Sequence, residues 1–301
     1  MRTLITGANG MLGQALVRRM TPAGHDLDVL ATARDDAPRF DEPPVNYARL
    51  DVTEADGVRA LLDDFHPDAV VNCAAMTQVD RCEEERAACR TVNTGAVETL
   101  AGACDEVGAR LVQVSTDFVF DGENGPYDED AVPNPVNFYG QAKLDGERAA
   151  RRAERWAIAR TVLVYGLPQD ESRSNIVLWI QRALAGGEDV HVVTDQHRTP
   201  TYAPDLAAGV AQLVRSESEG VFHLAGPELL SVYSFARRVA DAFDLDADLI
   251  HPTDSTSLDQ PAKRPPRTGF VIEKARRALG YEPRPLDDAL RDMRERLERD
   301  Q

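Results

Sequence analysis

The sequence has few lysines and no long apolar run. Lysine accounts for three of its 34 basic residues, whereas 51 residues are acidic, and the formal net charge at pH 7 is −17. An acidic excess of this size repels phosphate groups, so we expect no nucleic-acid partner. No apolar stretch reaches the roughly 20 residues that a membrane-spanning helix needs, and the N-terminus predicts no targeting leader. We therefore expect a folded protein of the cytoplasm with no membrane partner.

The cysteines are also few, and they do not follow a metal-binding pattern. None of the four is part of a C-x-x-C spacing, and they lie in a segment that we predict to be helix and buried strand: Cys73, Cys82, Cys89 and Cys104. Reduced, buried thiols are the expected state of such residues in a cytoplasmic protein. We therefore predict no metal site.

The scarcity of lysine beside abundant Asp and Glu has two interpretations. It is typical of the surface of a halophilic protein. It is also what a GC-rich genome produces, because such a genome favours arginine over lysine codons. Both can hold together, and we predict a halophilic protein.

A glycine-rich turn near the N-terminus predicts a nucleotide-binding loop. A strand predicted over Arg2–Thr6 is followed by G-A-N-G-M-L-G and then by apolar residues at helical spacing. Glycines let the backbone approach a pyrophosphate, which binds at the N-terminus of the next helix. An ordinary turn explains one or two glycines better than three spaced as G-x-x-G-x-x-G. We predict that the cofactor-binding residues of this loop are Gly7, Asn9, Gly10, Met11 and Leu12.

The end of the second predicted strand bears on the choice of cofactor. This strand, Leu27–Ala33, lacks the terminal acid that usually binds the ribose 2′-hydroxyl of NAD. Arg34 follows it and suits a 2′-phosphate, although Asp35 and Asp36 weaken this indication and a charged loop is the alternative. We predict NADPH as the cofactor, with NADH tolerated, and Arg34 as a cofactor-binding residue.

Two further strand ends are predicted to line the cofactor. The third strand ends at Leu50-Asp51-Val52, where a carboxylate is placed for the adenine edge. The fourth, Asp68–Cys73, ends in small residues that leave room for a flat cofactor. The predicted cofactor contacts here are Asp51, Val52, Cys73, Ala74 and Ala75.

Asn93 is a polar residue in a long predicted helix, Cys82–Val107. Two interpretations are open: its side chain braces the backbone near the site, or it faces solvent. On the first interpretation we include Asn93 among the cofactor-binding residues.

Tyr139 and Lys143 are the main candidates for catalysis. They lie four residues apart in a predicted helix, so both side chains point to one side. A phenol has a pKa near ~10, and a nearby ammonium stabilises its anion and lowers that pKa. A strand predicted over Arg110–Ser115 delivers Thr116 to the ligand-binding edge of the sheet, where its hydroxyl can reach the same substrate oxygen. The alternative is a tyrosine–lysine pair on a solvated helix face.

The order of the predicted elements indicates the fold. Strands alternate with helices up to residue 164, which predicts an α/β protein with a Rossmann-type, doubly wound parallel sheet. We predict a dinucleotide-binding domain over residues 1–164 plus 203–225 and a smaller C-terminal substrate lobe over 165–202 plus 226–301. The last predicted helix, Leu286–Glu298, is charged on most faces and is expected to cap the surface.

Four ordered motifs resemble one enzyme family. The glycine turn, Asn72-Cys-Ala-Ala, Ser115-Thr116-Asp117 and Tyr139-x-x-x-Lys143 resemble the extended short-chain dehydrogenase/reductase superfamily. Within it, residues 74–83, Ser-Thr-Asp-Phe-Val-Phe-Asp-Gly, Asp-Gln…Thr-Pro-Thr and Arg264-Pro-Pro resemble the dTDP-4-dehydrorhamnose reductase family over residues 1–285. The resemblance implies NADPH- or NADH-dependent reduction of the 4-keto group of a deoxy sugar linked to a nucleoside diphosphate.

The resemblance also implies roles for residues. It makes Thr116, Tyr139 and Lys143 catalytic, with Tyr139 and Lys143 also touching the cofactor. Bacterial members usually carry Trp where this chain has Leu163, which leaves the identity of the sugar open. The predicted substrate-binding residues are Thr77, Val79, Asp117, Asn175 and Arg264.

Other functions are compatible with the same residues. A nucleotide-sugar epimerase or dehydratase of this superfamily uses a similar site but recycles its hydride. A relative of these reductases serves as a regulatory subunit of methionine adenosyltransferase and binds NADP. The partner that we predict is a nucleotide-sugar substrate, and a homodimer is open.

Overall fold

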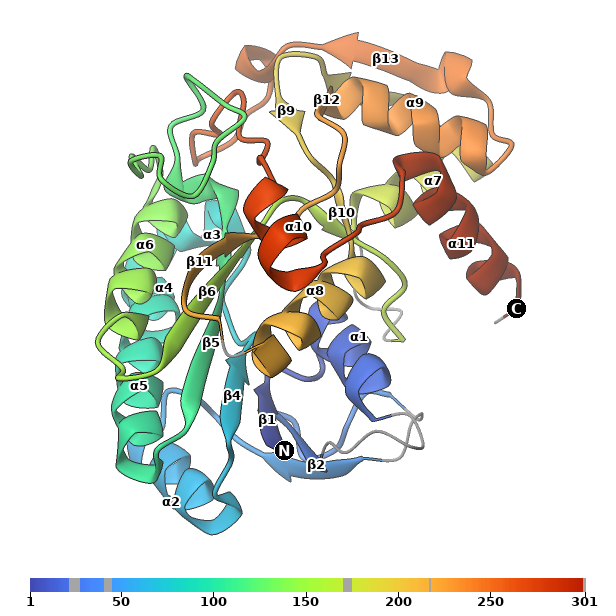
Figure 1. The fold of residues 1–301 in the computed structure, drawn as a ribbon. Coiled ribbons are helices and arrows are strands. Elements are labelled where there is room, and N and C mark those ends of the chain that lie inside the picture. The colour runs from blue at the N-terminus through green and yellow to red at the C-terminus, as the bar shows by residue number, and fades with distance from the viewer. Residues whose placement is uncertain (22–27, 41–44, 170–174, 217, 300–301) are drawn as a thin grey trace.

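A seven-stranded parallel sheet forms the centre of the protein (Figure 1). The structure is a computed structural model that describes residues 1–21, 28–40, 45–169, 175–216 and 218–299. The strand order is β11-β6-β5-β4-β1-β2-β3, and all neighbours are parallel. The strands are β1 (Arg2–Thr6), β2 (Asp28–Ala33), β3 (Asn46–Arg49), β4 (Ala69–Asn72), β5 (Arg110–Thr116), β6 (Trp156–Thr161) and β11 (Gly220–His223). The predicted Rossmann-type sheet is confirmed, although Leu27 of the predicted second strand lies outside the described residues.

Helices cover both faces of this sheet. α1 (Met11–Met20) and α8 (Ala203–Ser216) share an apolar core on one face, and α2 (Ala55–Phe65), α5 (Ala96–Val107) and α6 (Phe138–Ala150) share a second core on the other (Figure 1). Strands between two helical layers are apolar on both sides, and all four residues of β4 are accordingly buried. The sheet is thereby buried between two helical layers, and loops follow the carboxyl ends of its strands.

The segment that we predicted as one helix, Cys82–Val107, is broken, so this prediction was wrong. The backbone leaves helical geometry at Glu85, with φ −110° and ψ 52°. A π-helical turn then brings Asn93 to a buried position. Such turns are frequent at functional sites, and apolar periodicity does not reveal them. The observed elements are α3 (Val79–Glu84), α4 (Arg86–Arg90), the π-helical turn (Thr91–Gly95) and α5.

A further group of helices and strands has an apolar core of its own. Its elements are α7 (Ile176–Ala185), β8 (Val190–Val193), α9 (Val232–Ala242), β13 (Ile250–Thr253) and α11 (Leu286–Arg299), and β8 pairs with β13 in parallel. We predicted that the last helix is charged on most faces and caps the surface. One face of α11 also belongs to this core, through Leu286, Ala289, Leu290 and Met293.

Short elements connect the two groups. β7 (Val164–Tyr165) pairs with β10 (Thr201–Tyr202), and β9 (His197–Arg198) pairs with β12 (Leu230–Ser231). The remaining elements are α10 (Glu273–Leu279) and the 3-10 turns Asp117–Val119, Ala247–Leu249 and Ser255–Ser257. Across the described part of the chain, we find no helix with the length and apolar character needed to cross a membrane.

Candidate active site

The catalytic candidates on α6 are held against the end of β5. The Asn137 side chain accepts a hydrogen bond from the Gly140 amide at 2.8 Å and so caps the start of α6. A Cβ atom on Gly140 would lie 2.1 Å from the Phe118 carbonyl oxygen, so glycine allows the helix to approach this closely. Tyr139 and Lys143 are 8% and 5% exposed. Both side chains are therefore buried near the carboxyl end of the sheet.

Thr116, the last residue of β5, lies close enough to Tyr139 to lower the pKa of its phenol. The Thr116 hydroxyl also donates to Asp117 Oδ1 at 3.1 Å and accepts from the Phe118 amide at 3.2 Å. Burial raises the pKa of Tyr139 well above its usual value; the neighbouring Thr116 hydroxyl opposes this rise and the Asp117 carboxylate adds to it. The structure thus places two of the three predicted catalytic side chains near each other.

The ammonium of Lys143 is bonded to the backbone of β5. Its Nζ donates to the Val114 carbonyl at 2.7 Å. Burial lowers the pKa of Lys143 to about 8, and the Glu147 carboxylate opposes this fall. The lowering of the Tyr139 pKa by Lys143 that we predicted is not seen in this structure, because burial, Thr116 and Asp117 are the main influences on that pKa.

Asn93 braces the loop after β4, which decides between the two interpretations of this residue. Its Oδ1 accepts from the Met76 amide and its Nδ2 donates to the Met76 carbonyl, both at 2.9 Å. Cys73, Ala74 and Ala75 immediately precede Met76, so this pair of bonds fixes the segment predicted to line the cofactor. The direct contact of Asn93 with the cofactor stays a prediction.

The glycine turn before α1 has the form that a pyrophosphate requires. Gly7 has a φ of 65°, and a Cβ atom there would lie 2.8 Å from the Ala74 amide nitrogen. α1 begins at Met11 after Gly10, and within the described residues no side chain caps it. The amides of its first turn, including those of Met11 and Leu12, are therefore placed to bind an anion. These residues fit the phosphates of a dinucleotide.

Asn9 orders the loop that follows β2. Its Nδ2 donates to Asp35 at 2.7 Å and its Oδ1 accepts from the Arg39 amide at 2.9 Å. The Arg39 guanidinium forms two further bonds with the Asp35 carboxylate, each of 3.0 Å. Arg34 is exposed, and no hydrogen bond or ion pair joins it to another described residue. The Asp35 carboxylate is thus engaged within the loop, while Arg34 faces solvent.

Asp51 closes a turn between β3 and α2. It accepts hydrogen bonds from the Thr53 amide at 2.9 Å and the Thr53 hydroxyl at 2.7 Å. Burial opposes ionisation of Asp51, but the Thr53 bonds and the charges of Arg34 and Arg49 outweigh it and lower the pKa. The carboxylate is therefore ionised beside Val52, which is buried.

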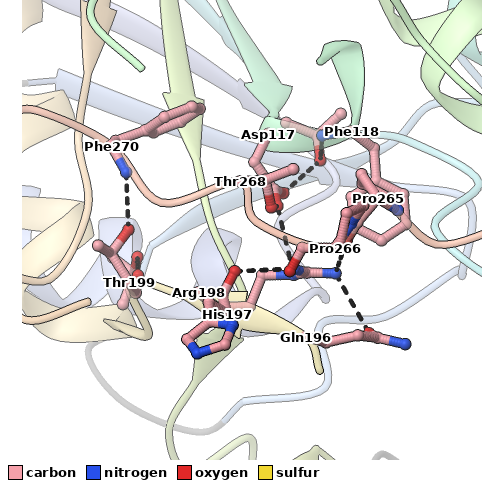
Figure 2. A network of polar contacts seen from close by, with 12 residues as sticks. Asp117, Phe118, Gln196, His197, Arg198, Thr199, Pro265, Pro266, Thr268 and Phe270 are labelled. Atoms are coloured by element: carbon pink, nitrogen blue, oxygen red, sulfur yellow. Dashed lines mark hydrogen bonds and ion pairs between the residues drawn. The ribbon is translucent and has the colours of Figure 1, made fainter. Parts of the chain in front are cut away.

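The Asp117 carboxylate is held within the protein by residues from distant parts of the chain (Figure 2). It accepts a hydrogen bond from the Thr268 hydroxyl and lies 3.7 Å from the Arg198 guanidinium. Arg198 also donates to the Pro265 carbonyl at 2.8 Å and to the Gln196 side chain at 3.2 Å. Burial raises the pKa of Asp117, and Arg198 and Thr268 oppose this rise. A sugar contact by Asp117 stays a prediction, and the contacts seen here join β5 to the loop at 265–268.

Two other substrate candidates also make structural contacts. Arg264 forms a bidentate ion pair with Asp80 on α3, in which Nη2 lies 2.5 Å from Oδ2. Asn175 caps α7 through the Val177 amide at 3.1 Å and donates to the Gly166 carbonyl at 2.8 Å. Substrate contacts by both residues stay predictions.

Nearly the whole chain matches one protein family. The model described as the RmlD substrate binding domain covers residues 1–299. The chain belongs to the RmlD substrate-binding domain family. The resemblance to the dTDP-4-dehydrorhamnose reductases is thereby confirmed.

Relatives of this chain include reductases and a subunit of methionine adenosyltransferase 2. A probable low-salt glycan biosynthesis reductase, Agl14, from Haloferax volcanii is 36% identical over 293 residues, covering 96% of each chain. A dTDP-4-dehydrorhamnose reductase from Mycolicibacterium smegmatis is 34% identical over 301 residues, covering 99% of this chain and 84% of the relative. Methionine adenosyltransferase 2 subunit beta from Xenopus tropicalis is 34% identical over 273 residues, covering 88% and 78%. The Haloferax relative is consistent with the predicted halophilic character.

Solved structures agree with this family membership. A dTDP-4-dehydrorhamnose reductase from Clostridium acetobutylicum has a TM-score of 0.89 and 31% identity, covering 99% of this chain and 100% of the other. The enzyme of the same name from Bacillus anthracis, in complex with NADP, has a TM-score of 0.84 and 29% identity, covering 97% and 98%. The fold of the chain is therefore that of these reductases.

Two residues of this RmlD-family site were missed by the sequence analysis. Arg198 and Thr268 are both buried around Asp117. The Asp-Gln…Thr-Pro-Thr motif drew attention to the loop that carries Arg198, but an arginine in a polar loop gives no sign of burial. Of the remaining candidates, Thr77 is exposed and Val79 is half-buried, and both follow the loop that Asn93 holds.

Proposed function

We propose that the protein reduces the 4-keto group of a deoxy sugar linked to a nucleoside diphosphate, with NADPH as the preferred reductant and NADH tolerated. The observation that carries this proposal is the placement of Thr116 and the buried Tyr139 and Lys143 at the carboxyl end of β5, the sheet edge to which the glycine turn also belongs. The dTDP-4-dehydrorhamnose reductases among the relatives and the NADP complex among the similar structures support it.

Each catalytic candidate has a role in this reaction. The bound cofactor supplies the hydride. Tyr139 donates a proton to the ketone oxygen as that oxygen gains negative charge, and Thr116 donates a hydrogen bond to the same atom. Because burial raises the Tyr139 pKa, the phenol is protonated before the reaction, as a general acid requires. Proton donation of this kind contributes about 10²–10⁴-fold to the rate. Lys143 holds the ribose of the cofactor from the same helix face.

The cofactor-binding residues divide by the part of the dinucleotide that they fit. The first-turn amides of α1 and the glycine turn hold the pyrophosphate. Arg34 binds the 2′-phosphate, Asp51 and Val52 line the adenine, and the small residues after β4 lie along the flat part of the cofactor. The engagement of Asp35 by Arg39 supports NADPH, because it occupies the carboxylate nearest to Arg34 in sequence.

The separate apolar core of α7, β8, α9, β13 and α11 supports a substrate lobe, for which we keep the division into residues 1–164 plus 203–225 and 165–202 plus 226–301. Thr77, Val79, Asp117, Asn175 and Arg264 bind the nucleotide sugar in this proposal. We further propose a cytoplasmic protein. The homodimer is still a prediction, which light scattering of the purified protein checks.

A non-catalytic role is the second candidate. The observation in its favour is the 34% identity to the beta subunit of Xenopus tropicalis methionine adenosyltransferase 2. In that role the protein binds NADP and a partner subunit without turnover. The presence of Thr116, Tyr139 and Lys143 together favours an enzyme, because a binding subunit has no need of a proton donor.

The deciding experiment combines the purified protein with NADPH and a panel of nucleoside-diphosphate 4-keto sugars, while the absorbance of the reduced cofactor is followed. We expect oxidation of NADPH with at least one sugar and slower oxidation of NADH. Binding of NADPH without oxidation by any sugar would support the regulatory role. Conversion of a sugar without net loss of NADPH would instead support an epimerase or dehydratase.

A further inference from the structure

A carboxylate lies on the same face of α6 as the catalytic candidates. Glu147 follows Lys143 by four residues and Tyr139 by eight, so the three side chains share that face. The Glu147 side chain has no exposed surface. A buried carboxylate stays ionised only where hydrogen bonds and an opposite charge replace the lost water.

Glu147 has such partners on two strands. The Ser115 hydroxyl donates to Oε1 at 2.6 Å, and the Arg160 guanidinium donates from Nε to Oε1 at 2.8 Å and from Nη2 to Oε2 at 2.7 Å. Arg160 is itself 1% exposed. Its Nη1 lies 3.5 Å from His223 Nε2, and its guanidinium lies 5.1 Å from the centre of the Phe120 ring. These contacts fix the carboxylate between β5, β6 and α6.

Two successive residues of β5 are bonded to α6, and the next residue, Thr116, lies near Tyr139. The Val114 carbonyl accepts from Lys143 Nζ at 2.7 Å, and Ser115 Oγ donates to Glu147 Oε1 at 2.6 Å. The Glu147 bond is therefore one of the two that hold the helix against the strand beside the catalytic candidates.

Glu147 is also the carboxylate that acts on the Lys143 ammonium. The groups that influence Lys143 are Glu147 on the same helix, Cys73 after β4 and Cys89 on α4. Burial raises the pKa of the Cys73 thiol to about 12, so this group carries no charge at neutral pH. Burial lowers the pKa of Lys143 to about 8, and Glu147 opposes that fall.

We propose that Glu147 is a positioning residue of the catalytic site, which fixes β5 against α6 and keeps the charged Lys143 in place. The inference rests on the proposed function for the part that Lys143 plays in reduction, whereas the contacts that carry it involve neither substrate nor cofactor. The alternative is a buried ion pair with Arg160 that only stabilises the fold. The two differ in what happens to Lys143 when the Glu147 carboxylate is neutralised.

The small number of lysines makes this difference measurable. With ¹³C-labelled lysine, an NMR titration of the cofactor-free protein follows all three lysines, and Lys263→Arg and Lys274→Arg assign the signals. Glu147→Gln keeps the size of the side chain and removes its charge. We expect the Lys143 pKa to fall by at least about one pH unit, which is the lower end of the effect of a close opposite charge. Lys263 and Lys274 should titrate as in the wild type.

A second variant distinguishes the effect of losing the Glu147 carboxylate from the effect of leaving Arg160 without its partner. Glu147→Gln leaves Arg160 buried without its partner, so we add Glu147→Gln/Arg160→Met, which removes both charges and is expected to fold. The proposal requires a lowered Lys143 pKa in both variants. If the single variant does not fold, the Lys143 pKa of the double variant is the test. A Lys143 titration that matches the wild type in the double variant overturns the proposal.

The pH dependence of activity gives an independent readout. We expect the high-pH limb of kcat/KM to move to lower pH in the folded variants by the same amount as the Lys143 titration. A limb that stays in place while Lys143 shifts overturns the link between Glu147 and catalysis. A wild-type protein without activity on any 4-keto sugar instead counts against the proposed function, and the lysine titration still tests the contact.

Discussion

The ammonium of Lys143 donates a hydrogen bond to the Val114 carbonyl at 2.7 Å, in a position where the lysine is 5% exposed. Burial lowers the pKa of this lysine from 10.5 to about 8. The folded protein therefore holds a charge at a site that disfavours it. Buried charges that lower the stability of the fold are typical of catalytic sites. Removal of the Lys143 charge should therefore lower activity but raise stability.

We predict that Lys143→Met abolishes reduction but stabilises the protein. At about 1.4 kcal/mol per unit of pKa difference, the buried charge costs a few kcal/mol, and loss of the bond to Val114 offsets part of the gain. The expected net increase in the free energy of unfolding at pH 7 is about 1–2 kcal/mol. The folded pKa lies below the unfolded one, so the gain is complete below pH 8 and shrinks as the pH rises towards 10.5.

Urea denaturation at several pH values measures this effect. Lys263→Met is the matched control, because Lys263 is exposed and its removal should leave the free energy of unfolding nearly unchanged. A Lys143→Met protein that is less stable than the wild type at pH 7 would show that the ammonium is a net stabilising group.

Tyr139→Phe should reduce turnover by at least about 10²-fold and leave cofactor affinity little changed. The substitution removes the proton donor, while the ring still packs edge-on against Phe118. Steady-state kinetics and a cofactor titration measure the two effects. Tyr233→Phe is the control and should keep wild-type turnover, because Tyr233 is only partly buried and packs against the core of α7, α9 and α11. If the Tyr139 variant retains most of its activity, the phenol has no part in the mechanism.

The sheet and the glycine turn could be predicted because their signals are local. Each strand of a parallel α/β sheet ends at the same edge, so Thr116 and the residues after β4 could be assigned to one site without knowledge of any contact. The burial of Asn93 could not be predicted, because the π-helical turn that places it has no pattern in the sequence.

The contacts of Asp117 with Thr268 and Arg198 could not be predicted from the sequence for a different reason. Thr268 lies 151 positions later in the chain, and its hydroxyl meets Asp117 only because the loop at 265–268 folds back onto β5. Arg198 is bonded to two backbone carbonyls of that loop, those of Pro265 at 2.8 Å and Pro266 at 3.3 Å. Contacts between loops depend on the folded arrangement and not on periodicity.

Arg198→Met should destabilise the protein by about 3–5 kcal/mol, because it leaves the Asp117 carboxylate buried without its opposite charge. Adding Asp117→Asn removes that charge and should restore part of the loss. Without the guanidinium the Asp117 pKa, already raised by burial, rises further, so the deficit of Arg198→Met shrinks as the pH falls and Asp117 takes up a proton.

Denaturant unfolding of the two variants and the wild type tests this coupling. Arg237→Met is a control, because Arg237 is exposed and should change stability by less than about 0.5 kcal/mol. Equal losses in Arg198→Met and in the double variant would mean that the unpaired Asp117 carboxylate is not the cause of the destabilisation.

The melting temperature should rise with salt. The protein carries a net charge of −17, and repulsion among its acids acts over long distances at low ionic strength. Salt shortens that range to about 3 Å at 1 M. Exposed ion pairs such as Arg81–Glu85 also weaken, but each contributes little. Calorimetry in dilute buffer and in molar KCl measures the net effect of salt on the melting temperature. A melting temperature that does not change with salt would contradict the prediction.

Arg34→Ala should raise the KM for NADPH by about 10–100-fold and leave that for NADH nearly unchanged. Arg34 is exposed just after β2, where a guanidinium can bind a 2′-phosphate through two parallel hydrogen bonds. Bonds between charged groups contribute about 1.5–3 kcal/mol, which sets the expected range. Asp35, which competes for this role, is held by Arg39 and Asn9. The overall negative charge disfavours NADPH only weakly, because salt screens it within about 10 Å at 0.1 M.

Kinetics with both cofactors, and titration of each in the absence of substrate, test this expectation. Arg19→Ala is the matched control, because Arg19 is exposed on the last turn of α1 and should affect neither cofactor. An equal loss of NADPH and NADH affinity in Arg34→Ala would make Arg34 a general loop charge. The preference for the phosphorylated cofactor would then be decided by another part of the site.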